Sequence, residues 1–341
     1  MVSSMADDVI EQQFTVDARP ELSISNISGQ IDVRAGDGST ISLRATKHGS
    51  QQAMANTRID FRHDGNRVRI ETKGERSGLL NLSRNVSSVD YELIVPRDCE
   101  VQAQTVSAEV RIEGLSAAVS AQTVSGDVEL TGISGDCQVT TVNGDATGRR
   151  ITGALTLRTT SGDTDVRDSE LRHFNLNSVS GDFAIESPLT VGQHYLAKTV
   201  SGDLRLLVPA EVRATVQMKT VSGDVASDLQ AEVIKAGRRH WQGRINGGGA
   251  TVEMSSVSGD LRIQQANGSS KGAVSPSTSV ASPEVAPPVQ PEASAVSNNL
   301  PIPEPPIEDA PEIPADTGAV LKALERGEIT VEEAMQRLGG Q

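Results

Sequence analysis

Aromatic residues are scarce in this chain and make up only 2% of its 341 residues. A core built of Val, Ile, Leu, Ala and Thr suits narrow, layered packing better than a wide globular interior. No stretch approaches 18 consecutive apolar residues, so no transmembrane helix is expected. Basic residues are outnumbered by acidic ones, and a net charge of −14 argues against a nucleic-acid partner.

Cysteine is equally rare. Cys99 and Cys137 lie 38 positions apart and form no Cys-x-x-Cys motif. Cys137 occupies an apolar position, which favours a small core residue, with a disulfide to Cys99 as the alternative. The first 13 residues contain Asp7, Asp8 and Glu11 and no apolar run of seven, so no secretory signal is expected. We therefore expect a cytoplasmic protein, with the inner face of the membrane as an alternative location.

A short phrase, by contrast, recurs along most of the chain. One copy reads Thr123-Val124-Ser125-Gly126-Asp127-Val128-Glu129-Leu130, and its glycine falls at positions 126, 144, 162, 181, 202, 223 and 259, with Ala108 in its place once. The early segment 26–33 is a weaker copy. A short, nearly fixed period is typical of a chain that stacks one unit on itself.

The apolar positions of the phrase alternate as in a strand. Val124, Val128 and Leu130 are expected on one face, as are Val200 and the leucines that follow it. One unit cannot bury such a stripe alone, but stacked units can. A weaker half-copy at 133–139 indicates two or three short strands in each coil. We therefore expect an all-β fold, a β-solenoid of 18–21-residue coils in which glycine bends the chain where a side chain would clash.

Composition divides the chain into four parts. Residues 1–8 are expected to be a disordered start, and 9–264 the solenoid, with 9–100 as N-terminal cap and first coils. Within it, 101–264 hold the regular coils and a C-terminal cap containing Trp241 and Gly247-Gly248-Gly249. Residues 265–316 carry 11 of the 15 prolines, which indicates an extended linker. Residues 317–341 are expected to form a docking module of two helices.

The docking module is predicted from two helical stripes. Residues 319–326 form the first stripe, which Gly327 ends, and Thr330-Val331-Glu332-Glu333 is a capping box for the second. Helices this short are unstable alone, so they must pack on a protein partner or a copy of themselves. The expected docking residues are Leu321, Leu324, Ile329, Ala334 and Leu338.

The acidic residues that follow the motif glycines form the most unusual pattern in the chain. In register, these residues would form a column of carboxylates one strand spacing apart. We favour solvated turns in which each carboxylate accepts backbone N–H bonds, and a calcium ladder is the alternative. The column comprises Asp127, Asp145, Asp163, Asp182, Asp203, Asp224 and Asp260.

Other candidate chemistry is weak. The motif serines and Thr123, Thr141, Thr159, Thr199 and Thr220 are expected to form hydroxyl ladders between coils rather than to act as nucleophiles, because no Gly-x-Ser-x-Gly occurs. The five histidines share no metal-binding spacing and are expected at the surface. We read the glycine triplet as a turn, and residues 238–241 as a turn rather than a basic aromatic patch. No catalytic, metal or cofactor residue is therefore assigned.

With these motifs in view, the repeats at residues 10–264 resemble the bacterial β-strand-repeat family of "putative adhesins", whose members repeat T-V-S-G-D. The segment Glu325-Arg326-Gly327-Glu328-Ile329-Thr330 and its continuation is similar to a short helical module found beside such repeats. In relatives like the cell-envelope-stress proteins LiaG and YvlB, the pairing implies a role at or near the membrane. No enzymatic activity comes with the family.

We therefore expect a non-catalytic scaffold, a rod with a helical docking tail, that is envelope-associated or stress-related. A surface adhesin or glycan-binding protein is the alternative.

Overall fold

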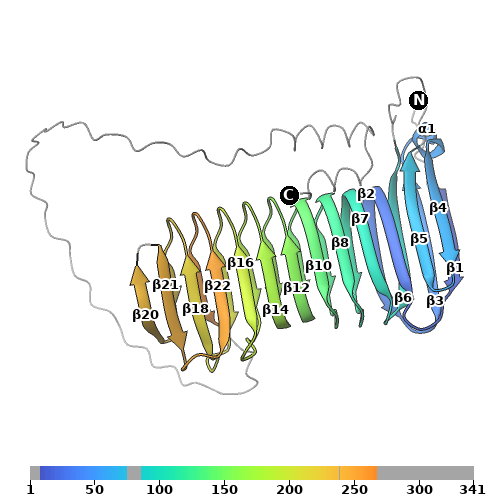
Figure 1. Cartoon of the computed structure of the whole chain (residues 1–341). Helices are drawn as coiled ribbons and strands as arrows, with labels where there is room; N and C mark the ends of the chain where they lie inside the picture. The colour runs from blue at the N-terminus through green and yellow to red at the C-terminus, as the bar shows by residue number, and fades with distance from the viewer. Residues whose placement is uncertain (1–7, 75–85, 238, 267–341) are drawn as a thin grey trace, which may run out of the picture.

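The computed structural model describes residues 8–74, 86–237 and 239–266. This part of the chain consists of strands and one short helix, α1 (Gln51–Ala55). Its strands belong to one continuous hydrogen-bonded sheet, and Figure 1 shows them side by side in an elongated stack that ends at β20. The all-β expectation is confirmed. The linker beyond residue 266 and the helices expected at 317–341 lie outside the described residues.

The sheet turns back on itself, so that two layers of strands enclose the core. The first layer contains, in spatial order, β4 (Thr57–Asp64), β5 (Arg67–Gly74), the first half of β2 (Glu21–Gly36), the first half of β7 (Glu100–Glu113), β8 (Val119–Ser125), β10 (Cys137–Asn143), β12 (Thr152–Arg158), β14 (Glu170–Asn177), β16 (His194–Lys198), β22 (Ala250–Ser255), β18 (Ala214–Lys219), β21 (His240–Ile245) and β20 (Ala231–Gly237). The second layer contains β1 (Asp8–Thr15), β3 (Thr40–His48), β6 (Ser88–Pro96), the second halves of β2 and β7, β9 (Val128–Thr131), β11 (Ala146–Arg149), β13 (Thr164–Arg167), β15 (Phe183–Glu186), β17 (Leu204–Val208), β23 (Leu261–Gln265) and β19 (Val225–Ser227).

Each regular coil contributes one strand to each layer, and the coils pair in parallel. Cys137 pairs with Val119 of the preceding coil and with Leu155 of the next, and all three are buried. The same column continues through Phe174 and Tyr195, whose rings meet edge to face at 5.1 Å. Burying each such side chain stabilises the fold by about 1.5–3 kcal/mol before entropy is counted. The predicted columns of stacked apolar residues are therefore confirmed.

The N-terminal end contains antiparallel pairs, unlike the regular coils. β1 and β6 flank β3, and β4 and β5 form a hairpin whose turn contains Gly65 at φ +57°. A buried polar group lies just inside this end: the Thr72 hydroxyl is 2.5 Å from the Tyr91 hydroxyl and donates to Oδ1 of Asn26. Burial raises the pKa of Tyr91 to about 12.

At the C-terminal end, the coils do not stack in chain order. β22 pairs with both β16 and β18, so the last coil in sequence lies between the two that precede it. The hairpin of β20 and β21 pairs with the outer edge of β18, and the returning chain therefore fills the inner edge. This hairpin ends the stack in Figure 1. Trp241 is half-buried against the core there, in keeping with its expected capping role.

Candidate functional site

The repeated Ser-Gly-Asp phrase forms the turn that carries the chain from the first layer to the second. The glycine is required by the close approach of successive turns. A Cβ placed on Gly162 would lie 2.2 Å from the carbonyl oxygen of Gly144, and Gly162 has φ +128°, a conformation that other residues rarely adopt. The expectation that glycine sits where a side chain would clash is confirmed.

The weaker half-copy forms a second turn on the opposite edge of the coil. A Cβ on Gly153 would lie 2.4 Å from the carbonyl oxygen of Gly135, which repeats the relationship seen in the main turn. Asp136 repeats the acid as well, because its Oδ1 accepts the backbone N–H of Ala154 at 3.1 Å. Each regular coil thus has two strands and two turns.

The motif aspartates form a continuous ladder from coil to coil. Oδ1 of Asp182 accepts the backbone N–H of Asp203 at 2.8 Å, and the other motif aspartates except the terminal Asp224 do the same at 2.7–2.9 Å. This arrangement supports the turn interpretation of these carboxylates rather than a calcium ladder. No group of three His, Cys, Asp or Glu within the described ranges is arranged to hold a metal ion. The ladder runs Asp127, Asp145, Asp163, Asp182, Asp203, Asp260 and Asp224.

The hydroxyl ladders expected between coils are not observed. Thr159, Thr199 and Thr220 donate instead to the carbonyl oxygen two residues further along their own turn, at 3.0–3.1 Å. The buried hydroxyl oxygens of Thr123 and Thr141 have no hydrogen-bond partner among the described residues. The physical reason for Thr159, Thr199 and Thr220 is local, because the carbonyl oxygen two residues on lies within hydrogen-bonding distance of the hydroxyl.

The valine of the motif departs from the expectation for most later coils. Val124 is buried, but Val200 is 49% exposed, because it follows β16 and the buried Thr199 and therefore points outward from the turn. Val179, Val257 and Val221 are exposed to 48%, 50% and 58%. Parallel bridges between the adjacent serines place these valines one strand spacing apart, in the order 179, 200, 257, 221. We call these four residues the valine row. Alternation along an extended strand points the valine outward where the preceding threonine points inward, as in Thr199-Val200, whereas both members of Thr123-Val124 are buried.

The outer surface of the first layer carries a second regular feature. One outward column runs through Ser23, Gln102, Ser120, Gln138, Thr156 and Asn175, which are in register on consecutive strands. These side chains are all uncharged and polar, in a chain with 22% charged residues. A shallow groove of about 300 Å³ crosses the strands there and is bordered by Glu100, Asp136 and His173. We call this surface the amide face.

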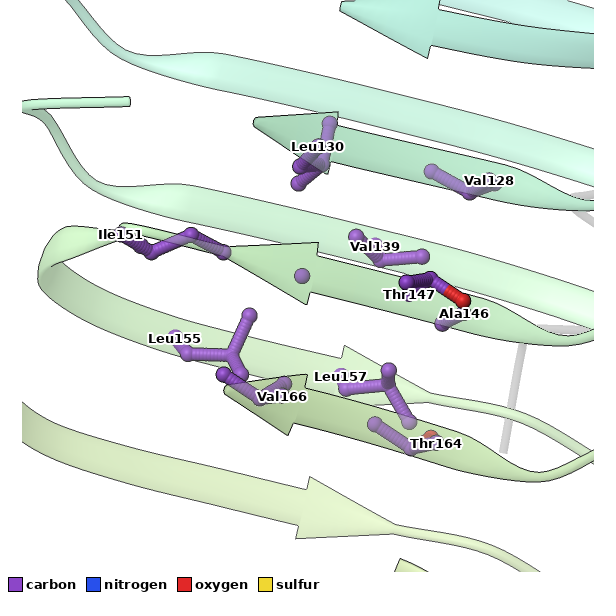
Figure 2. Close-up of a pocket in the computed structure, with 11 residues that line it drawn as sticks. Val128, Leu130, Val139, Ala146, Thr147, Ile151, Leu155, Leu157, Thr164 and Val166 are labelled. Atoms are coloured by element: carbon purple, nitrogen blue, oxygen red, sulfur yellow. The ribbon is translucent and has the colours of Figure 1, made fainter. Parts of the chain in front are cut away.

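A small cavity lies in the interior at the coil formed by β10 and β11. Figure 2 shows Val128, Leu130 and Val166 converging on it from neighbouring strands. Its volume is about 10 Å³, enough for about one water molecule. It arises because Ala146 and Gly148 stand where the adjacent coil has Val128 and Leu130. The cavity is a packing gap and is too small for an organic ligand.

Cys99 and Cys137 are free and buried, so the disulfide alternative is wrong and the core interpretation of Cys137 is confirmed. Burial raises the pKa of both thiols to about 12, which keeps them in the unreactive protonated form at neutral pH. His63, His173 and His194 are exposed, as expected. Gly247 and Gly248 adopt φ of +80° and +81°, which confirms the turn.

The remaining predicted positions are only partly described. Leu321, Leu324, Ile329, Ala334 and Leu338 lie outside the described residues, as does Arg238. In the segments 8–74, 86–237 and 239–266, no helix has the length and apolarity needed to cross a membrane.

The comparisons with known proteins agree with the repeat analysis. The family model described as Toastrack DUF4097 matches residues 20–264, well over half of the chain. No curated protein matches the chain. Among solved structures, a "putative adhesin" from Bacteroides fragilis is 12% identical over 75% of this chain and 97% of its own, with a TM-score of 0.46.

Two further solved structures are similar at lower TM-scores. A "putative lipid binding protein" from Parabacteroides distasonis is 11% identical over 75% of this chain and 96% of its own, with a TM-score of 0.40. A "putative cell adhesion protein" from Clostridium sporogenes is 13% identical over 76% of this chain and all of its own, with a TM-score of 0.25. The resemblance read from the repeats is confirmed by the family match: the chain belongs to the Toastrack DUF4097 family.

Proposed function

We propose that this chain is a non-catalytic structural and interaction scaffold. In this proposal, a rod of stacked coils carries a C-terminal docking module and works in an envelope-associated or stress-related assembly, at the inner face of the membrane or in the cytoplasm. The rod itself needs no cofactor, and the module at residues 317–341 recruits a protein partner or a second copy.

The observation that carries this proposal is how the repeated motif is used. The glycine allows adjacent turns to touch, and the Asp182 carboxylate, like its equivalents, binds the backbone of the next coil. The most strongly repeated chemistry in the chain is therefore directed along the stack. A motif that repeats because it holds each coil on the next favours a scaffold over a catalyst.

The amide face favours a second candidate, a surface adhesin or glycan-binding protein. Gln102, Gln138 and Asn175 offer donors and acceptors at regular spacing along a flat surface, which suits the hydroxyl groups of an extended uncharged polysaccharide. Under this candidate, Gln102→Glu and Gln138→Glu would weaken binding to such a polymer, because each replaces a donating amide by a carboxylate.

Cell fractionation with protease treatment of intact cells separates the two candidates. The scaffold proposal expects the chain in a cytosolic or inner-membrane fraction, protected from added protease. A protease-accessible surface pool would favour the adhesin. Light scattering of the chain with and without residues 318–341 then tests the module: an unchanged mass excludes self-association and leaves docking on a different protein.

A further inference from the structure

We propose that the valine row is the surface on which residues 319–338 of the same chain dock. This inference rests on the proposed function, in which that segment is the docking module. The inference states where the module binds when it has no other partner. The rod then competes with those partners for the apolar side of the module.

The valine row is a continuous apolar strip on a fixed backbone. The carbonyl oxygens of Val179, Val200 and Val257 each accept an N–H from the serine of the neighbouring turn at 2.9 Å. With four valines at the spacing of adjacent strands, the strip is about 14 Å long. Single exposed apolar residues are ordinary on protein surfaces, but a contiguous ridge indicates a contact surface.

The dimensions of the expected helix match the strip. Residues 319–326 as a helix would be about 12 Å long and would place Leu321 and Leu324 on one side. A helix of eight residues is not stable alone, so it forms only where its apolar side is covered. The valine row covers that side along almost the full length of the helix.

The polar side of the expected helix is compatible with this occupant. At 3.6 residues per turn, Lys322 and Arg326 lie on the side opposite Leu321 and Leu324. Both basic side chains therefore stay in solvent when the leucines rest on the valines.

The segment can reach the strip easily. The described chain ends at Ala266, directly after β23, whose coil also contains Val257. Between Ala266 and Ala319 lie 52 residues. A flexible chain of that length has an r.m.s. span of about 40 Å, and extended proline-rich stretches span more. The coil edge that carries the valines is only about 20 Å from the end of β23, one strand length away.

Disulfide cross-linking in the full chain tests the inference. One variant combines Val200→Cys with Leu324→Cys. The matched control combines Val191→Cys with Leu324→Cys, since Val191 is 60% exposed but lies outside the valine row. The native thiols are buried and contribute little background. We expect the Val200 pair to form an intrachain bond about tenfold faster than the control, because docking raises the local concentration of the tail thiol.

A third variant carries Val179→Ser and Val257→Ser in addition to the Val200 pair. Its rate should fall to that of the control, while its unfolding temperature stays that of the parent, because both valines are exposed. Equal rates for the two cysteine pairs would overturn the inference, and so would cross-links formed mainly between two chains in dilute solution. The proposed function is tested separately: if Leu324→Asp still abolishes recruitment of a partner by the full chain, only the resting site of the module is wrong.

Discussion

Oδ1 of Asp203 accepts the backbone N–H of Asp260 at 2.7 Å, although 57 positions separate the two residues in the chain. Asp260 in turn accepts the N–H of Asp224, which comes earlier in sequence. The ladder therefore follows the spatial order of the coils and not their order in the chain. The same hydrogen bond therefore forms between coils that are adjacent in space, even where they are not consecutive in the chain. The motif connects one coil to the next.

Replacing one aspartate of the ladder should lower the free energy of unfolding by an amount that depends on whether an acceptor oxygen remains. Asp182→Ala leaves the N–H of Asp203 without its carboxylate, and we expect a loss of about 1–2 kcal/mol in the free energy of unfolding. Asp182→Asn keeps an acceptor oxygen and should cost less than half as much. Denaturant titration of both variants measures the difference, and equal losses would show that the hydrogen bond is unimportant.

Two glycines in neighbouring coils provide a matched pair of substitutions. Gly162→Ala drives a Cβ against the backbone of Gly144 and forces φ +128° on alanine, so we expect a loss of about 3 kcal/mol or more. At Gly148 a Cβ meets the flexible end of Ile151 beside the small cavity of Figure 2. Gly148→Ala should therefore remain within about 1 kcal/mol of the parent. Thermal unfolding distinguishes the two, and a reversed order would contradict this packing.

Calcium should leave stability unchanged. Each aspartate of the ladder except the terminal Asp224 already binds a backbone N–H, as Asp145 does with Asp163 at 2.8 Å, so these carboxylates are engaged along the stack. We expect the same unfolding temperature in EDTA and in millimolar calcium. Magnesium serves as the control for ionic strength. A higher unfolding temperature in calcium, but not in magnesium, would instead support the calcium ladder.

Alkaline pH should destabilise the fold through its buried acids. The pKa values of Cys99, Cys137 and Tyr91 are each raised to about 12 by burial, whereas the unfolded chain releases these protons nearer pH 9–10. Stability contributed by these groups is complete below about pH 8.5 and is lost as pH rises toward 12. Denaturant midpoints should fall across this range.

The variant Cys99→Ala with Cys137→Ala tests the origin of that fall. It should be less stable than the parent at neutral pH, because it leaves small cavities, but its alkaline decline should be shallower. An identical decline would mean that the thiols take no part in it.

Much of the fold can be predicted from the sequence, because stacking the coils restricts which residues can occupy the repeated positions. Stacking at one strand spacing requires glycine wherever two turns touch, so residues such as Gly144 and Gly162 record the geometry directly. Alternation then places Val128 and Leu130 in the core. The turn hydrogen bonds of the aspartates also follow, since a carboxylate beside glycine has backbone N–H groups within reach.

Other features could not be read in this way. The insertion of β22 between β16 and β18 depends on where the hairpin of β20 and β21 finds its partner, a long-range choice that leaves no local signal. The outward direction of Val200 depends on where β16 ends. Both of these determine the candidate site, because they bring Val200, Val257 and Val221 into one row.

Amide hydrogen exchange at the motif turns tests most directly whether the repeats serve the stack. In the intact chain, the N–H groups of Asp145, Asp163, Asp182 and Asp203 should exchange slowly, since each is bound by the carboxylate of the preceding coil. Asp182→Ala should release the amide of Asp203 and leave that of Asp145 protected. Exchange of all these amides at the rate of free peptide, with or without the substitution, would contradict the account.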